Sequence, residues 1–186
     1  MTQYDFSSLI RLYKKMDADF DRVATRYNFH CTGCTDNCCT SLFFHHTFIE
    51  KAFLVQGFLQ MDPIRKKEIQ TRAADYVDQT FAHGPAGRSL KMMCPLNHRA
   101  RCSLYVFRPM ICRLHGLPHE LHPPGRQVIK GTGCDAGQFD GKPYVPFDRT
   151  PYYRDMAALE KQFKDHHSLT ERPRQTIAQM LLRPDA

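Results

Sequence analysis

The sequence predicts a mainly α fold, in which a small helical bundle supports a loop-rich segment that carries many cysteines. Apolar residues recur every three to four positions in the first half of the chain and again near its end, which is the period of amphipathic helices. Most of the prolines fall within residues 84–151, where they prevent long helices. With 186 residues and 42% apolar content, the chain is long enough for one core, so we expect a single domain over residues 1–186.

The helical part, residues 1–83, opens with a helix over residues 5–27. Its apolar stripe includes Leu9, Met16 and Val23, with charged residues on the opposite face, and Asp5 or Ser7 is the expected cap. A second, mostly buried helix is predicted over residues 47–61. Asp62 and Pro63 then provide an N-cap and a proline at the first helical position, so a third helix should follow and pack on the second as a hairpin.

The loop-rich part, residues 84–151, should contain short helical turns and short strands near residues 104–107 and 128–129. A segment of this length without long elements needs another source of order, and bonds between thiolates and metal would supply it. Residues 152–186 return to helical periodicity. We expect one helix through residues 153–163 and a second, short helix that begins near Pro173.

Eight cysteines are the main chemical signal of the sequence, and four of them lie within residues 31–39. A C-x2-C pair lets two thiolates on one turn reach the same ion, and thiolates select zinc, copper(I) or iron–sulfur clusters. No secretory signal is recognised, so a cytoplasmic, reducing environment is expected, and it favours metal over a disulfide framework. The predicted metal ligands are Cys31, Cys34, Cys38, Cys39, Cys94, Cys102, Cys112 and Cys134.

Charge and hydropathy restrict the partners. No run of about 18 apolar residues exists, so no membrane partner is expected. The net charge of +7 raises the possibility of nucleic acid, but the basic residues are scattered, which argues against that partner. A four-thiolate site is itself anionic. Arg108 and Arg113, which lie among the later cysteines, are therefore expected to donate to sulfur from outside the coordination sphere.

The later cysteines stand in a longer pattern. Cys94-Pro-Leu is followed by Cys102-x-x-Tyr-x-x-Arg-Pro-x-x-Cys112-Arg and then by Cys134. With the first cysteine loop, this pattern resembles the CxxCxxCC, or YkgJ-like, family of zinc- or iron-chelating cysteine-cluster proteins, over about residues 31–134. One difference is that three residues rather than two separate Cys34 from the double cysteine. Tyr105, which lies within this pattern, is expected to be a core residue.

The resemblance implies a protein that coordinates zinc or an iron–sulfur cluster, and the two remain nearly even. One relative, flagellin lysine N-methylase, transfers methyl groups from S-adenosylmethionine, so an iron–sulfur-dependent redox or methyl-transfer enzyme is the alternative. A basic adaptor for nucleic acid or protein ranks third, and a protein partner is not identified. One mononuclear zinc or one [4Fe–4S] cluster takes four thiolates, so the eight cysteines do not reveal which four share a site.

Two histidine patterns offer weaker alternatives. His46 and Glu50 would share a helix face if the helix began early enough, although an exposed polar face explains them better. His115, His119 and His122 have helical spacing, but the prolines around them argue against a regular helix.

Overall fold

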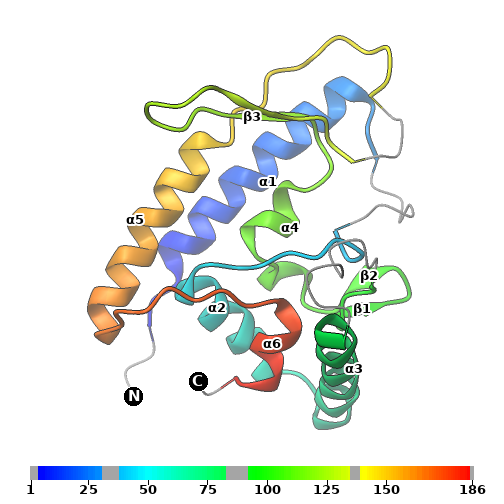
Figure 1. Cartoon of the computed structure of the whole chain (residues 1–186), viewed down its shortest axis with the longest axis vertical. Coiled ribbons are helices and arrows are strands. Elements are labelled where there is room, and N and C mark those ends of the chain that lie inside the picture. Colours follow the sequence, from blue (N-terminus) through cyan, green and yellow to red (C-terminus); the bar gives the residue numbers. More distant parts are fainter. Residues whose placement is uncertain (1–3, 31–37, 83–91, 135–138, 185–186) are drawn as a thin grey trace. The chain divides into compact units, whose positions relative to one another are not determined.

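The computed structural model describes residues 4–30, 38–82, 92–134 and 139–184 (Figure 1). This part of the chain contains six α-helices, one short 3-10 helix and two small two-stranded sheets, so the predicted mainly α class is confirmed. The helices are α1 (Ser7–Tyr27), α2 (Phe48–Leu59), α3 (Pro63–Ala82), η2 (Tyr105–Phe107), α4 (Met110–Leu114), α5 (Thr150–His167) and α6 (Ile177–Leu182). The strands are β1 (Asn97–His98), β2 (Arg101–Cys102), β3 (His119–Leu121) and β4 (Ile129–Gly131).

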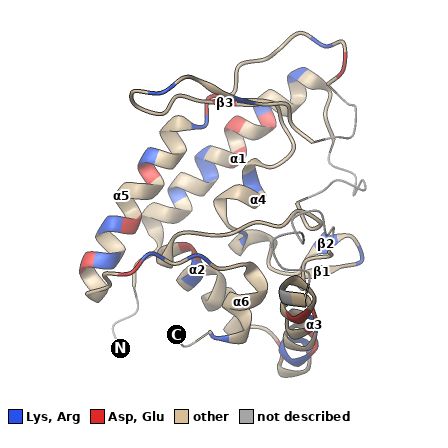
Figure 2. Ribbon diagram, viewed as in Figure 1, with Lys and Arg blue, Asp and Glu red and all other residues tan. Residues whose placement is uncertain are grey.

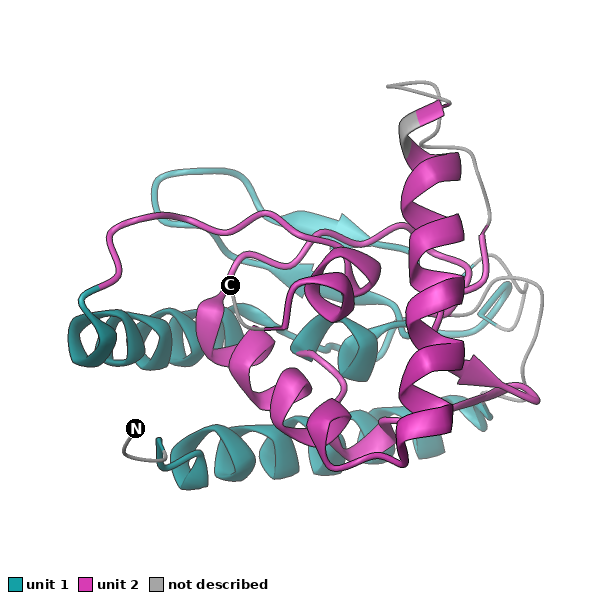
Figure 3. Cartoon of the chain, turned by 90° about the horizontal axis from the view of Figure 1, so that it is seen from below, with its two compact units in different colours: residues 1–37, 110–168 teal, residues 38–109, 169–186 magenta. Residues whose placement is uncertain are grey.

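The chain divides into two compact units (Figure 3). The single domain over residues 1–186 stays a prediction. Unit 1 comprises Met1–Asn37 and Met110–Ser168, and unit 2 comprises Cys38–Pro109 and Leu169–Ala186. Each unit is therefore built from two separate stretches of chain. Length and composition bound the amount of core but not its partition, because the partition depends on contacts between residues that are distant in sequence.

Unit 1 is organised around α1, which α4 and α5 contact. The predicted helix over residues 5–27 is confirmed, because its apolar stripe is buried. The buried residues of α1 are Leu9, Leu12, Tyr13, Met16, Val23, Ala24 and Tyr27. Asp5 supports the start of the helix by accepting a hydrogen bond from the Ser7 amide at 2.8 Å, although the N-cap position itself is Phe6. The sheet of unit 1 pairs β3 antiparallel to β4.

Unit 2 has a core made by three helices and the residues that flank its β1–β2 hairpin. α6 packs along α3 and also contacts α2. The main helical partner of α3 is therefore α6, from the end of the chain, and not α2, with which a helical hairpin was expected. The buried core residues of unit 2 are Leu54, Phe58, Ile69, Ala73, Tyr76, Leu96, Leu104, Ala178, Met180 and Leu181. Because Leu96 and Leu104 belong to this core, the hairpin between them is anchored to the helices.

Local sequence signals explain two helix starts in unit 2. The Asp62 carboxylate accepts hydrogen bonds from the amides of Ile64 at 2.9 Å and Arg65 at 3.2 Å, as an N-cap does, so the predicted start of α3 is confirmed. α6 begins later than predicted, at Ile177. The Thr176 hydroxyl and the Gln179 side chain form a reciprocal capping box there, which fixes the first turn.

The segment that precedes α4 was predicted less well. Residues 105–107 form the 3-10 helix η2 instead of a strand, whereas β4 does lie close to the strand predicted at residues 128–129. Tyr105, which was expected in the core, is 62% exposed. The buried residue of this turn region is instead Leu104. An aromatic and β-branched run as short as this one does not discriminate a strand from a helical turn.

Charged residues of both signs alternate along the surfaces of the long helices. Figure 2 shows Lys and Arg interspersed with Asp and Glu on α1, α3 and α5. Within the described residues, no helix is both long enough and apolar enough to cross a membrane.

Candidate metal centre

The β1–β2 hairpin carries two of the predicted ligands, Cys94 and Cys102. The Asn97 amide donates to the Cys94 carbonyl oxygen at 2.9 Å, which closes a turn, and Asn97 then pairs with Cys102 across the two strands. Arg99 and Ala100 form the tip of the hairpin with positive φ angles of 50° and 63°, the backbone that a tight two-residue hairpin turn requires. The turn and the register therefore bring the two cysteines, eight positions apart in sequence, into one local structure.

The segment that contains Cys38 and Cys39 joins this hairpin. The Cys94 amide donates to the Cys39 carbonyl oxygen at 2.6 Å, so the backbone of the first cysteine cluster is fixed against the second. The sequence stretches are far apart, and the contact is made within unit 2. Unit 2 thus gathers Cys38, Cys39, Cys94 and Cys102 in one region.

The pKa values of Cys39 and Cys94 are shifted in opposite directions. A hydrogen bond from the Cys38 thiol, with a second from the Asn97 side chain, lowers the pKa of Cys39 to about 6 despite partial burial. Burial raises the pKa of Cys94 to about 12, and the negative charges of Cys39 and Cys102 add to this rise. Negative charge on Cys39 and Cys102 would thus oppose ionisation of Cys94. A bound cation would relieve this repulsion.

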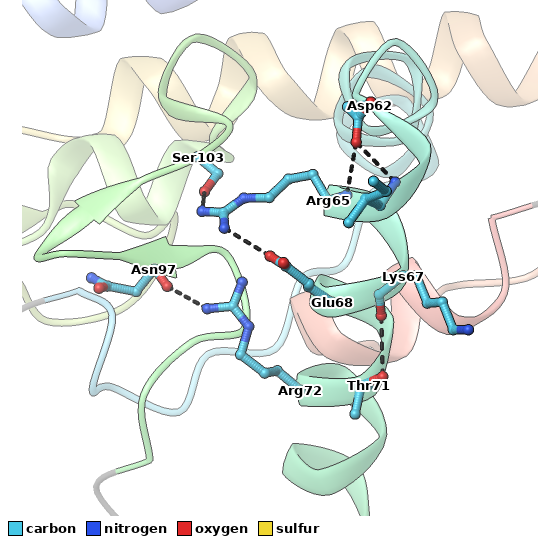
Figure 4. Close-up of polar contacts among 9 residues, drawn as sticks. Asp62, Arg65, Lys67, Glu68, Thr71, Arg72, Asn97 and Ser103 are labelled. Carbon is cyan, nitrogen blue, oxygen red and sulfur yellow. Dashed lines mark hydrogen bonds and ion pairs between the residues drawn. The ribbon is translucent and has the colours of Figure 1, made fainter.

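Two residues that sequence analysis did not identify complete this region. Arg72 of α3 donates to the Asn97 carbonyl oxygen at 2.7 Å (Figure 4), and its positive charge favours the thiolate form of Cys94. A signal for Arg72 was present in the sequence. It occupies the same helical stripe as the buried residues Ile69, Ala73 and Tyr76, where an arginine needs a specific polar partner.

Four predicted ligands remain, namely Cys31, Cys34, Cys112 and Cys134. Cys31 and Cys34 lie outside the described residues. Cys112 lies in α4 and Cys134 is buried, and both belong to unit 1. The Cys134 amide donates to the Gly116 carbonyl oxygen at 2.9 Å. The six described cysteines carry thiols rather than disulfides.

The two predicted sulfur donors have other contacts. Arg113 is 5% exposed, forms an ion pair with Asp17 at 2.6 Å and lies over the Tyr13 ring at 3.9 Å. Arg108 lies over the Tyr105 ring at 3.6 Å. The roles of both arginines beside sulfur stay predictions, since these contacts concern a carboxylate and aromatic rings.

The histidine alternatives gain no support from the arrangement. α2 begins at Phe48, which is after His46, so the condition for a shared helix face with Glu50 is not met. Glu50 is buried and accepts a hydrogen bond from the Thr47 hydroxyl at 2.6 Å, whereas His46 is exposed. His119 lies in β3 and not in a helix, with Nδ1 3.2 Å from the Leu117 carbonyl oxygen.

Within the described ranges, no three His, Cys, Asp or Glu side chains are placed so that together they could hold a metal ion. The four cysteines of unit 2 are therefore a set of soft donors without a complete coordination geometry among the residues described. In chemical type they fit zinc or an iron–sulfur cluster and not a hard cation such as Mg²⁺ or Ca²⁺, which prefers oxygen.

Comparison of the chain with family models, curated proteins and solved structures found no match. The resemblance to the CxxCxxCC family accordingly stays a prediction from the cysteine pattern.

Proposed function

We propose that the protein binds a thiophilic metal, either zinc or an iron–sulfur cluster, through the cysteines of unit 2. The observation that carries the proposal is the fixation of the Cys39 segment on the β1–β2 hairpin by the 2.6 Å hydrogen bond between the Cys94 amide and the Cys39 carbonyl oxygen. This contact gathers thiols from two distant stretches of sequence. Preorganisation of this kind reduces the ordering cost of coordination.

The electrostatics of the region support the same proposal. A thiolate is the form of cysteine that ligates metal, and the hydrogen bonds to Cys39 favour its thiolate at neutral pH. Cys94 resists ionisation because burial and neighbouring thiolates oppose its charge, and a bound cation would reverse this balance. The metal would supply crosslinks between the hairpin and the cysteine loop. The residues of unit 2 proposed to hold it are Cys38 or Cys39, Cys94 and Cys102. A reducing compartment such as the cytoplasm would keep these thiols available.

Metal analysis of protein purified without oxygen tests this proposal. We expect stoichiometric zinc in a colourless protein, or iron with sulfide and broad visible absorption from thiolate-bound clusters. Protein that contains neither metal, and that takes up neither after reduction and reconstitution, would contradict the proposal.

Cysteine variants then assign the ligands. Cys39→Ser and Cys94→Ser should each release the metal, because serine does not replace a soft thiolate ligand. Ser103→Ala is the matched control, since Ser103 follows Cys102 on the same hairpin and its hydroxyl contacts Arg65 at 3.4 Å. Cys112→Ser and Cys134→Ser report whether the cysteines of unit 1 contribute to metal content. Full metal retention in both unit 2 variants would remove the proposed site.

A further inference from the structure

The β1–β2 hairpin of unit 2 has one face towards the core and one face towards solvent. His98 pairs directly with Arg101 across the two strands, so their side chains share a face, and both residues are exposed. The other pair, Asn97 with Cys102, lies on the opposite face, where Cys102 packs against the core of unit 2. The register therefore places Arg101 on the solvent face of the hairpin.

Arg99 adds a second guanidinium group at the tip of the same hairpin (Figure 2). Its φ angle of 50° lies in the left-handed region, which glycine and asparagine occupy more readily than arginine. Within the described residues, neither Arg99 nor Arg101 forms an ion pair or a side-chain hydrogen bond. Two exposed positive charges are thus available to a partner, at a turn whose backbone favours other residue types.

Two arginines of α3 fix this hairpin on the helix (Figure 4). Nη1 of Arg72 donates to the Asn97 carbonyl oxygen at 2.7 Å, and Nη2 of Arg65 donates to the Ser103 hydroxyl at 3.4 Å. Arg65 also forms an ion pair with Glu68 at 2.9 Å, which offsets its charge. These contacts tie the strands on both sides of the turn to α3, so the tip is held in a fixed place.

The positive charge of this region is not balanced locally. Like the two arginines of the hairpin, Arg72 has no carboxylate within ion-pair distance in the described ranges. Together, Arg72, Arg99 and Arg101 form an arginine cluster. Desolvation, and then the positive charges of Arg65, Arg99 and Arg72, lower the pKa of His98, as expected where these charges converge. The fold therefore gathers cations that are scattered in the sequence.

An exposed aromatic ring follows on the same segment of chain. Tyr105 is 62% exposed, and the guanidinium group of Arg108 lies over one face of its ring at 3.6 Å. Ser103, which Arg65 contacts, precedes Tyr105 by two positions, so their Cα atoms lie at most about 7 Å apart. Cations that contact backbone phosphates beside an aromatic ring that stacks on a base are typical of single-strand binding.

We propose that this face of unit 2 binds single-stranded nucleic acid, with the arginine cluster on the phosphates and the Tyr105 ring on a base. Guanidinium groups bind phosphate oxygens through paired donors, and such contacts carry no base sequence. Stacking on Tyr105 requires an unpaired base, which favours a single strand over a duplex. The inference is independent of the proposed metal binding, because none of these side chains is a proposed ligand.

The test measures binding of the whole 186-residue chain to fluorescein-labelled oligo(dT) and oligo(rU) by fluorescence anisotropy over a series of salt concentrations. The variant Arg99→Gln/Arg101→Gln removes two charges of the cluster. The matched control is Arg126→Gln/Arg172→Gln, which removes two exposed arginines elsewhere. Each phosphate contact contributes about 0.7 to the slope of log affinity against log salt for a single strand.

We expect Arg99→Gln/Arg101→Gln to reduce that slope by about 1.4 and to weaken binding about 10–30-fold near 0.1 M salt. The control should leave the slope unchanged. Arg99→Lys/Arg101→Lys retains the charge and should retain the slope, which separates loss of charge from damage to the fold. Tyr105→Ala should weaken binding about 5–150-fold without a change in slope, whereas Tyr105→Phe should keep the affinity.

Several results would overturn the proposal. One is wild-type protein that binds neither oligonucleotide more tightly than about 10⁻⁴ M at physiological salt. Another is an equal loss of slope in the two glutamine variants. A duplex bound as tightly as the single strand would remove the role of Tyr105 and the assignment to single strands. Competition by poly-glutamate of equal charge as strong as that by oligo(rU) would indicate an acidic protein partner instead.

Discussion

The two units use buried and half-buried arginines in different ways. In unit 1, Arg113 is paired with Asp17 and covers the Tyr13 ring, while Arg149 donates to the carbonyl oxygens of Leu114 and Leu117. Nε of Arg149 is buried without a hydrogen-bond partner among the described residues. In unit 2, Nη1 of Arg72 donates to the Asn97 carbonyl oxygen, and its buried Nη2 has no hydrogen-bond partner among the described residues. The two units thus differ in what their arginines bind: a carboxylate and two carbonyl oxygens in unit 1, and one carbonyl oxygen in the segment that carries Cys94 and Cys102 in unit 2.

A first prediction sharpens this comparison at Cys39 and has the largest expected effect. With the pKa of Cys39 at about 6 instead of the ordinary 9.0, its thiolate fraction near pH 6 should exceed that of an ordinary cysteine by a factor on the order of 10²–10³. Alkylation by iodoacetamide, followed by peptide mapping of the reduced, metal-free protein, should therefore modify Cys39 at neutral pH. Cys94, with a pKa near 12, should stay unmodified.

The sign of the pH dependence follows from the lowered pKa. Stabilisation of the fold by the Cys39 thiolate is complete only above the ordinary value of 9.0 and is lost as the pH falls through about 6. Cys38→Ala serves as the control, because it removes the thiol hydrogen bond and should shift the Cys39 profile to higher pH. Identical profiles for Cys39 and Cys94 would contradict the assigned environments.

The second prediction concerns the structural arginine of unit 1. Arg149→Met should destabilise the protein in urea by about 1–3 kcal/mol for each of the two carbonyl groups that lose their donor. Metal content should not change. Arg154→Met is the control, since its side chain is 78% exposed and its loss should alter stability by no more than about 0.5 kcal/mol. Loss of metal in Arg149→Met without unfolding would break the distinction between the two units.

The third prediction tests how the helices of unit 2 support the hairpin. A methyl group at Gly57 would approach the Phe107 ring to 2.8 Å at Cδ1 and more closely at two other ring atoms. Gly57→Ala gains about 1 kcal/mol in helix propensity. The steric overlap costs about 1–3 kcal/mol, so we expect a net loss of up to about 2 kcal/mol in urea unfolding. In a Phe107→Leu background the same substitution should become stabilising. An unchanged sign there would show that Phe107 is not the obstacle.

The smallest effect is expected at the start of α6. Thr176→Ala removes the hydroxyl that accepts a hydrogen bond from the Gln179 amide at 3.3 Å and should cost about 1 kcal/mol in thermal or urea unfolding. Thr176→Ser retains the hydroxyl and should cost much less. Equal losses in the two variants would mean that the methyl group, and not the cap, stabilises this position.

Much of the helical fold could be predicted because its signals are local. The apolar stripe of α1 and the Asp62–Pro63 start of α3 depend on residues within a few positions of one another. The β1–β2 hairpin was not predicted, because its turn uses Arg99 and Ala100 at positive φ instead of the usual glycine or asparagine. The make-up of the two compact units has no local signal either, since each unit combines stretches that are distant in sequence.

The candidate site could be predicted only in part. The cysteines could be proposed as ligands from the sequence alone, because metal coordination depends on residue type and spacing. The sequence did not identify Asn97 and Arg72, which contact each other across 25 positions. It also gave no indication that Asp17, 96 positions earlier, is an ion-pair partner of Arg113. Hydrogen-bond partners of this kind are set by tertiary structure and leave no spacing signal in a single sequence.

The contribution of α6 to unit 2 has a consequence for biosynthesis. Ribosomes make the chain from its N-terminus, so α2 and α3 are complete while the buried residues Ala178, Met180 and Leu181 are still to be translated. At a synthesis rate of roughly 5–20 residues per second, this interval lasts several seconds. During it the nascent chain presents an uncovered apolar surface that chaperones can recognise, and the thiols of unit 2 reach their final setting only after translation has passed α6.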